Sequence, residues 1–282
     1  MPAPAVSVVV PTRNRSDYLA VTLASLTAQR VGAPFEILVV DDRSTDSTLS
    51  VARESGVRAV AVQSPGGLNA ARNTGVAETS GALIAFVDDD IWAPPGWLDA
   101  LLQGAGRHPE AEAFGGPIRA RMEGPAPRGC GREGALITHL DLGLKDRRAD
   151  MVWGANFAVR RAAFERFGAF DPGLAGHGDE EDWLMALTAA GGEIFYLARA
   201  GLDHRRSGDD ARLRSLARAA WYRGRAARRT DDRRGRTAGT AKDLRNLAGA
   251  GWHTVRRRCP QGLIMGAHSA GRLAETLRTP RR

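Results

Sequence analysis

Three carboxylates in a row, Asp88, Asp89 and Asp90, directly follow the apolar run LIAFV at 83–87. Like charges at this spacing repel one another, so they need a positive partner to offset them. Hard oxygen ligands suit a divalent cation, Mg²⁺ or Mn²⁺, above all where a phosphate group is bound as well. In an extended chain, the side chains of Asp88 and Asp90 share one side and can both reach one ion. The alternative is a solvated acidic loop before the turn residues APPG.

Two more acids, Asp41 and Asp42, end a second apolar run at 35–42. Apolar runs at 6–11, 35–42, 57–62 and 82–90 alternate with segments of helical periodicity at 15–29 and 44–55. Strands this uniformly apolar predict an α/β fold with a mostly parallel central sheet and helices on both faces. Ligands bind at the carboxyl ends of such strands. Those ends carry both groups of acids and, after the first strand, the polar segment at 11–13.

The second half of the chain predicts further elements. We expect a strand near 112–122, a strand and a helix within 151–172, a helix with acids at its start and a strand within 177–197, and an Arg-rich helix at 211–229. In that last helix, the spacing of four residues suggests one apolar stripe: Leu213, Leu216, Ala220 and Tyr222. Residues 230–247 are polar, and we expect weak order there.

Composition argues against several classes of protein. With 43% hydrophobic and 26% charged residues and no repeat, the chain has the composition of a folded domain. The segment after the first strand reads PTRNRS rather than G-x-G-x-x-G, which argues against an NAD or FAD enzyme. Cys130 and Cys259 match no metal or redox spacing, and neither a signal peptide nor a long apolar stretch is visible. We therefore expect a cytoplasmic protein without a membrane span.

Charge is distributed unevenly along the chain. Residues 1–204 hold 19 Lys and Arg against 26 Asp and Glu, a net charge of −7, whereas residues 205–282 hold 21 against 6, a net charge of +15. Such a basic segment suits nucleic acid, an anionic membrane surface or a phosphorylated lipid, or is simply a solvated face. We expect peripheral contact with the inner face of an anionic membrane or with a lipid-phosphate acceptor, and no nucleic acid partner.

Five motifs carry a resemblance to a known family: VSVVVPTRNR, ILVVDDRSTDST, NAARNTGVAETSGALIAFVDDD, WGANFAVRRAAFERFGAFDP and GHGDEEDWLMAL. In this order, over about residues 5–205, they resemble family 2 glycosyltransferases, which have the GT-A fold. The resemblance implies a metal-dependent, inverting enzyme that moves a sugar from a nucleotide-sugar to a hydroxyl of a glycan, lipid-linked or small-molecule acceptor. It also implies a catalytic domain at 1–205, with a nucleotide-binding half at about 1–110 and an acceptor half at about 111–205, and a basic helical extension at 206–282.

Matched to the family's motifs, twelve residues would contact or border the nucleotide-sugar: Pro11, Thr12, Arg13, Asp41, Asp42, Arg72, Asp88, Asp89, Trp153, Gly154, Ala155 and Asn156. Asp42 resembles the acid that hydrogen-bonds the base, and Asp88 resembles the acid on the ribose side. Arg72 would lie near the ribose or the pyrophosphate. The segment from Trp153 to Asn156 resembles one that lines the donor sugar and the acceptor.

For the metal, the resemblance implies Asp90 as a ligand together with Asp88. Some GT-A enzymes add a histidine at the position of His204, although a lone histidine is more often an ordinary surface or core residue. The two residues that follow, Arg205 and Arg206, are alternatives for binding phosphate.

An inverting transfer needs a general base to take the acceptor's proton. The family has an acid for this role at a helix start, and alignment on WLMAL puts Glu180 first, ahead of Asp182 and Glu181. Four acids in a row, from Asp179 to Asp182, leave the assignment open by one or two places. The alternative is a cluster of acids that only stabilises the positive end of a helix dipole.

Two other functions stay open at this point. A nucleotidyltransferase also joins an α/β sheet to metal and nucleotide, but it usually has a Gly-rich basic loop after the first strand, which this sequence lacks. A catalytically silent, membrane-associated scaffold that binds nucleotide is the second alternative. The intact set of acids at the strand ends argues against it.

Overall fold

The structure is a computed structural model that describes residues 3–62, 66–124, 137–174, 179–233, 235–236 and 239–278. The strands are β1 (Val6–Thr12), β2 (Phe35–Asp41), β3 (Arg58–Ala61), β4 (Leu83–Val87), β5 (Ile91–Trp92), β6 (Ala113–Gly115), β7 (Ile118–Glu123), β8 (Arg147–Arg148), β9 (Asn156–Arg160), β10 (Ile194–Tyr196) and β11 (Leu202–Ser207). The helices are α1 (Ser16–Thr27), α2 (Thr48–Glu54), α3 (Leu68–Glu78), α4 (Trp97–Arg107), α5 (Arg161–Phe167), α6 (Asp179–Ala189), the 3₁₀ helix η1 (Gly208–Ala211), α7 (Leu213–Arg233), α8 (Thr240–Arg257) and α9 (Gln261–Arg278).

The chain divides into two compact units, which are described separately. The first unit comprises Met1–Ala120, Thr138–Ala175 and Asp179–Arg205. The second comprises Arg121–Ile137, Gly176–Gly178 and Arg206–Arg282. Among the described residues, no helix combines the length and the apolar character that crossing a membrane requires.

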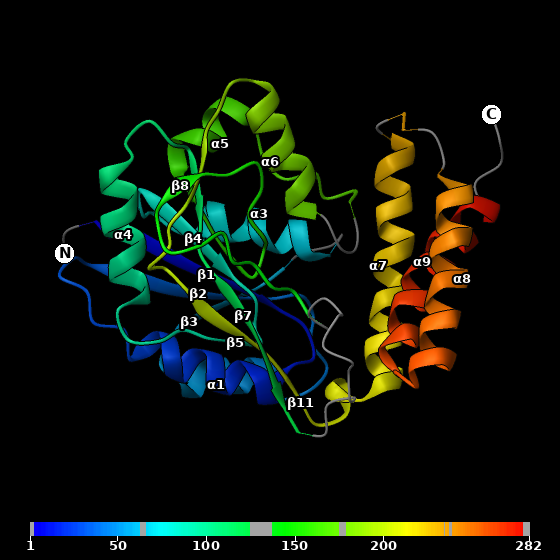
Figure 1. Cartoon of the computed structure of the whole chain (residues 1–282). Coiled ribbons are helices and arrows are strands. Elements are labelled where there is room, and N and C mark those ends of the chain that lie inside the picture. The colour runs from blue at the N-terminus through cyan, green and yellow to red at the C-terminus, as the bar shows by residue number, and fades with distance from the viewer. Residues whose placement is uncertain are drawn as a thin grey trace. The chain divides into compact units, whose positions relative to one another are not determined.

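The described strands of the first unit build an eight-stranded sheet in the order β3-β2-β1-β4-β9-β6-β10-β8. β3, β2, β1 and β4 are mutually parallel, whereas β9 runs antiparallel to both of its neighbours, β4 and β6. In the register of β1 and β2, Thr12 lies opposite Asp41. The parallel half therefore brings the carboxyl ends of β1, β2 and β4 to one edge of the sheet, as the sequence predicted (Figure 1).

Helices cover both faces of this sheet because the strands are apolar on both sides. In β1, the side chains of Val6, Val8 and Val10 pack into one core cluster, with apolar residues of α1, α2 and α4. The side chain of Val9 packs into the other cluster, with residues of α3, α5 and α6. All four valines are fully buried. The predicted α/β fold with a mostly parallel sheet between two layers of helices is confirmed (Figure 1).

The acids after β4 lie in a turn rather than in extended chain. β4 ends at Val87, and a new strand, β5, starts at Ile91. The hydroxyl of Thr22 on α1 lies 2.7 Å from the carbonyl oxygen of Asp89 and 2.8 Å from that of Ile91, and this buried group holds the turn in place. The prediction of an extended chain through Asp90 is therefore wrong.

A second, smaller sheet starts directly after this turn, and its order of strands is β5-β11-β7. β11 runs antiparallel to β5, and His204 lies opposite Ile91 in their register. The backbone N–H of Arg205 donates to the carbonyl oxygen of Asp90 at 2.8 Å. This pairing places a histidine 114 positions away in the sequence beside the acidic turn.

In the second unit, α9 packs against both α7 and α8 (Figure 1). A Cβ atom on Gly224 would lie 2.0 Å from the carbonyl oxygen of His268, so a glycine is needed where α7 and α9 approach. Charges add to the packing: Nε of Arg272 lies 2.8 Å from Oδ1 of Asp243 on α8, and its Nη2 lies 2.9 Å from Oδ2 of Asp231 on α7.

Several local predictions need correction. The single strand expected near 112–122 is two strands, β6 and β7, separated by Gly116 and Pro117. Helix α3 was not predicted, and α8 starts at Thr240, inside the segment expected to be weakly ordered. On α7, Leu216 and Ala220 are buried as predicted, but Tyr222 is 47% exposed and stands outside the stripe.

Candidate functional site

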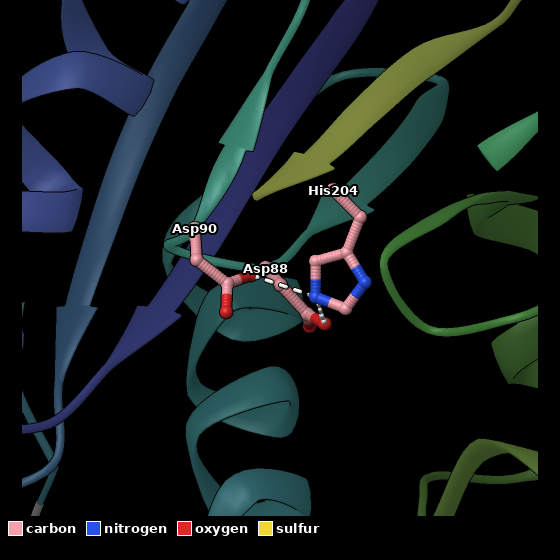
Figure 2. Close-up of side chains that lie close together, drawn as sticks. All are labelled: Asp88, Asp90 and His204. Atoms are coloured by element: carbon pink, nitrogen blue, oxygen red, sulfur yellow. Dashed lines mark ion pairs between the residues drawn. The ribbon is translucent and has the colours of Figure 1, made fainter. Parts of the chain in front are cut away.

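A cluster of two carboxylates and one imidazole lies at the carboxyl end of β4. One ligand atom from each of Asp88, Asp90 and His204 lies within 4.8 Å of the others. Nε2 of His204 is 2.9 Å from Oδ1 of Asp90 and 3.9 Å from Oδ2 of Asp88, and Figure 2 shows the ring nitrogen directed at both carboxylates. His204 and Asp90 are only 2% and 4% exposed.

This donor set fits a divalent cation. Carboxylate oxygens and an imidazole nitrogen suit Mn²⁺ in particular, and Mg²⁺ accepts the same oxygens. Nδ1 of His204 lies 3.4 Å from the carbonyl oxygen of Thr138. A proton on Nδ1 would therefore leave the lone pair of Nε2 on the side of the two acids.

The negative charge at this edge also has a protein partner, Arg15. Its Nη2 lies 2.6 Å from Oδ2 of Asp90, and its Nε lies 3.4 Å from Oδ1 of Asp89. The guanidinium stacks on the ring of Tyr18, with 4.1 Å between Cζ and the ring centroid. Sequence reasoning did not single out Arg15. The sequence feature that could have identified Arg15 is its position two residues after Arg13, in the loop that follows the first strand.

Burial and crowding of the carboxylates raise the pKa values of two acids in the turn. The pKa of Asp89 is raised to about 7, first by burial and next by the negative charge of Asp90, while Arg15 and a hydrogen bond from Thr12 oppose the rise. Burial also raises the pKa of Asp88, and Asp90 adds to it, against the effects of His204 and Arg72. A cation at the cluster would therefore favour the charged forms of Asp88 and Asp89.

Next to the cluster lies a cavity of about 350 Å³. Its lining comes from the strand ends and from α3: Pro11, Thr12, Arg13, Arg15, Asp42, Leu68, Ala71, Asp88, Asp89 and Asp90. The volume is in the range of small-molecule sites. Six of the residues predicted from the sequence to meet a nucleotide-sugar, together with the expected metal ligand Asp90, thus line one space.

The two acids after β2 differ in their surroundings. Asp42 reaches the cavity, where its carboxylate accepts a hydrogen bond from the backbone N–H of Gly67 at 3.1 Å and lies 3.6 Å from Nη1 of Arg13. Asp41 is outside the lining of the cavity. Its carboxylate accepts the backbone N–H of Ser44 at 3.2 Å, which stabilises the turn after the strand.

A second group of predicted residues meets in the interior beside the sheet. Arg72 on α3 is 2% exposed, and its Nη1 lies 3.3 Å from Oε2 of Glu180 at the start of α6. The other carboxylate oxygen of Glu180 accepts the backbone N–H of Gly154 at 2.9 Å. A Cβ atom on Gly154 would lie 2.6 Å from Nη2 of Arg72 and 2.9 Å from Oε1 of Glu180. Only glycine leaves room for this pair.

The remaining predicted residues have other contacts. Asn156 is buried, and its amide accepts from Nε1 of Trp97 at 3.1 Å and donates to the carbonyl oxygens of Pro117 and Ala200. It therefore joins segments of the fold. Ala155 is buried in the core, and Trp153 packs against the same cluster of apolar residues. Glu181 and Asp182 are half-buried on α6, and the side chain of Asp179 lies outside the described residues.

Comparison with known proteins gives a family. The model of glycosyl transferase family 2 matches residues 7–168. The chain is 32% identical over 234 residues to a pre-mycofactocin glycosyltransferase of Mycobacterium tuberculosis, which covers 79% of this chain and 47% of that protein. It is 32% identical over 210 residues to a validoxylamine A glucosyltransferase of Streptomyces hygroscopicus subsp. limoneus, which covers 63% of this chain and 46% of that protein. The chain spans about half the length of these relatives.

Two solved structures share the fold. The mannosyltransferase PcManGT from Pyrobaculum calidifontis, in complex with GDP-Man and Mn²⁺, matches 100% of this chain and 77% of its own with a TM-score of 0.59 and 16% identity. GalNAc-T7 with UDP, GalNAc and Mn²⁺ matches 80% of this chain and 51% of its own with a TM-score of 0.58 and 17% identity. The predicted GT-A fold is confirmed. The family match over more than half of the chain, together with a relative at 32% identity, shows that this protein belongs to glycosyl transferase family 2.

Proposed function

We propose that this chain transfers a sugar from a nucleotide-sugar donor to an acceptor hydroxyl, with inversion at the sugar. The observation that carries the proposal is the cavity at the strand ends, because its lining joins Asp42 to Asp88 and Asp90, the two acids that cluster with His204. A nucleoside bound there would meet Asp42 at one end, with its diphosphate directed at the cluster of Asp88, Asp90 and His204. Structural relatives solved with GDP-Man or UDP and with Mn²⁺ support the same choice of ligands.

In this proposal Asp88, Asp90 and His204 hold Mn²⁺ or Mg²⁺. A bound cation would offset the charge of the diphosphate and stabilise the nucleoside diphosphate as it leaves. Arg72 supports the same end of the donor: within the described residues its buried Nε has no hydrogen-bond partner, so one donor of a guanidinium fork is left for a polar ligand atom.

We further propose Glu180 as the general base. Among the acids at the start of α6, it is the one whose described contacts connect it to Arg72 and Gly154. Its charge also acts on Asp88 in the metal cluster. The hydrogen bonds from Arg72 and Gly154 orient this carboxylate, which a base requires before it takes a proton from an acceptor hydroxyl.

One relative is named for validoxylamine A, which favours a small-molecule acceptor, and glycan or lipid-linked acceptors remain alternatives. We propose that residues 1–205 form the catalytic domain and that the basic extension at 206–282 contacts an anionic membrane, because residues 205–282 carry a net charge of +15.

A panel of nucleotide-sugars with Mn²⁺, Mg²⁺ or EDTA tests the proposal. We expect one nucleotide class to raise the melting temperature only with metal present and to release nucleoside diphosphate when an acceptor is supplied. Release of sugar 1-phosphate instead, with formation of a nucleoside triphosphate when pyrophosphate is supplied, would indicate a nucleotidyltransferase. Stabilisation by a nucleotide-sugar without any release, across glycan, lipid-linked and small-molecule acceptors, would indicate a silent binding protein.

A further inference from the structure

Helix α8 in the second unit has two faces of different character. Asp243 and Ala250 are buried, and Leu247 and Thr254 are half-buried, on the face that packs against α9. On the remaining surface Leu244 is 54% exposed, Trp252 is 69% exposed and Val255 is 78% exposed. Large apolar side chains are therefore left in water on a helix that already buries another face.

These exposed residues form one stripe rather than scattered points. Positions 244, 248, 252 and 255 recur at the spacing of successive helical turns, and all four are apolar and exposed in this sequence. Single exposed apolar residues need no explanation, but a continuous stripe indicates an interaction surface. We call Leu244, Ala248, Trp252 and Val255 the α8 stripe.

The exposed charges of α8 have a single sign, and Arg245 and Arg256 are the ones next to the α8 stripe by helical spacing. Five exposed cations belong to α8 and the residue after it: Lys242, Arg245, Arg256, Arg257 and Arg258. None of the five forms an ion pair within the parts of the chain that the structure describes. The helix contains one acid, Asp243, which is buried and lies 2.8 Å from Nε of Arg272 on α9. The exposed side of α8 therefore presents apolar and positive groups without a compensating negative charge.

We infer that the α8 stripe docks on the surface of an anionic lipid bilayer. A helix with large apolar side chains on one side and cations beside them lies in the plane of the interface, with the apolar groups among the acyl chains and the cations at anionic headgroups. This inference deepens the membrane contact proposed above by naming the helix and the residues that make it. It does not depend on the transfer of a sugar.

Two other occupants fit the surface less well. Nucleic acid would pair with the cations, but it would leave the apolar stripe exposed to water between them. A second copy of the chain docked through the same face would bring Arg245 and Arg256 against like charges, because a two-fold interface is self-complementary. An anionic bilayer satisfies both the apolar and the charged groups.

Vesicle sedimentation of the full chain tests the inference. The vesicles contain either phosphatidylcholine alone or equal parts of phosphatidylcholine and phosphatidylglycerol. We expect the wild type to bind only the anionic vesicles, and the double variant W252S/V255S to lose about tenfold or more of its partition coefficient. The matched control is Leu144→Ser, which removes a 99% exposed leucine from the first unit and should bind as the wild type does.

A second pair of variants separates charge from apolar contact. R245Q/R256Q should weaken binding to anionic vesicles and make it less dependent on salt, because two headgroup contacts are lost. Unchanged vesicle binding by W252S/V255S, with its thermal melt intact, would overturn the inference. So would concentration-dependent self-association that the double variant abolishes, or binding to DNA or RNA that outcompetes vesicles. Nucleotide release with a soluble acceptor is measured in parallel. The vesicle experiment does not depend on this activity, so the two proposals can be judged separately.

Discussion

Nη1 of Arg72 lies 3.3 Å from Oε2 of Glu180, although the two residues are 108 positions apart in the chain. Cζ of the guanidinium lies 5.5 Å from the ring centroid of Phe157 and 5.8 Å from that of Phe170. The backbone N–H of Gly154 completes the contact from a third segment. Three segments of the chain therefore converge on one carboxylate, and its orientation is set by groups that are themselves buried.

Replacing Glu180 by glutamine keeps the shape of this side chain and removes its ability to accept a proton. We expect turnover of the donor and acceptor pair to fall by about 10²–10⁴-fold, because that is the usual contribution of a general base. Binding of the nucleotide-sugar, measured by thermal shift with Mn²⁺, should persist. Asp182→Asn is the matched control. If Asp182→Asn is inactive and Glu180→Gln is active, the general base is Asp182 and not Glu180.

Gly154→Ala tests the close approach at the same place. The added Cβ would meet the side-chain ends of Arg72 and Glu180, so the pair has to shift. A displacement of about 1 Å in such a group costs up to about 10²-fold in rate, and we expect a loss of that order in kcat. Gly106→Ala on α4 is the matched control, because a Cβ there meets nothing within 4 Å. Equal rates for the two variants would contradict the positioning role.

Asp90→Asn and His204→Ala test the metal cluster without an activity assay. Each removes one of three proposed ligands, so we expect the stabilisation of the protein by Mn²⁺ to be lost and the affinity for Mn²⁺ to fall by about tenfold or more. Isothermal titration with Mn²⁺ and thermal melts with and without EDTA give the two readings. Asp150→Asn, at an exposed position, should retain both. Wild-type affinity for Mn²⁺ in both cluster variants would rule the cluster out.

Arg15→Ala tests the competition between a protein cation and the metal. The guanidinium occupies the side of Asp90 and Asp89 that a bound cation would also need to neutralise. We expect the metal-free protein to be less stable and the affinity for Mn²⁺ to rise by about tenfold, because one pair worth roughly 1.4 kcal/mol no longer has to be broken. Arg30→Ala removes an exposed positive charge from the same unit and serves as the control. A fall in Mn²⁺ affinity would show that Arg15 assists the metal instead.

The helical unit should lose stability in acid through Glu275. Burial alone raises the pKa of Glu275, but hydrogen bonds from Arg225 and Arg229 outweigh it and hold the pKa below the usual 4.5. The unfolded chain therefore binds a proton before the folded one does, so the stabilisation is complete above about pH 4.5 and is lost as the pH falls through the lower folded value. Thermal melts from pH 7 to pH 3 should show a smaller acid loss for Glu275→Gln than for the wild type. Parallel curves of melting temperature against pH would show that Glu275 does not contribute to the loss of stability in acid.

Much of the first unit follows from local pattern. Uniformly apolar runs can be buried only in a sheet covered on both faces, and parallel strands bring their carboxyl ends to one edge. The gathering of Asp42, Asp88 and Asp90 around one space was therefore predictable from their positions alone. Helix α3 was missed because its sequence, LNAARNTGVAE, lacks an apolar stripe and carries a glycine, so packing of Ala71 and its neighbours stabilises the helix more than propensity does.

Tertiary structure decided the rest, because those features depend on contacts between distant segments. The turn at Asp89 is held by a hydroxyl from α1, and His204 reaches the cluster only because β11 pairs with β5. No periodicity in the sequence marks Arg15 as the partner of Asp90. The exposed stripe on α8 likewise becomes visible only when the opposite face is seen to be packed against α9. By itself the sequence determined which residues stand at the strand ends. The fold decided which of them lie close enough to form ion pairs or to bind one cation.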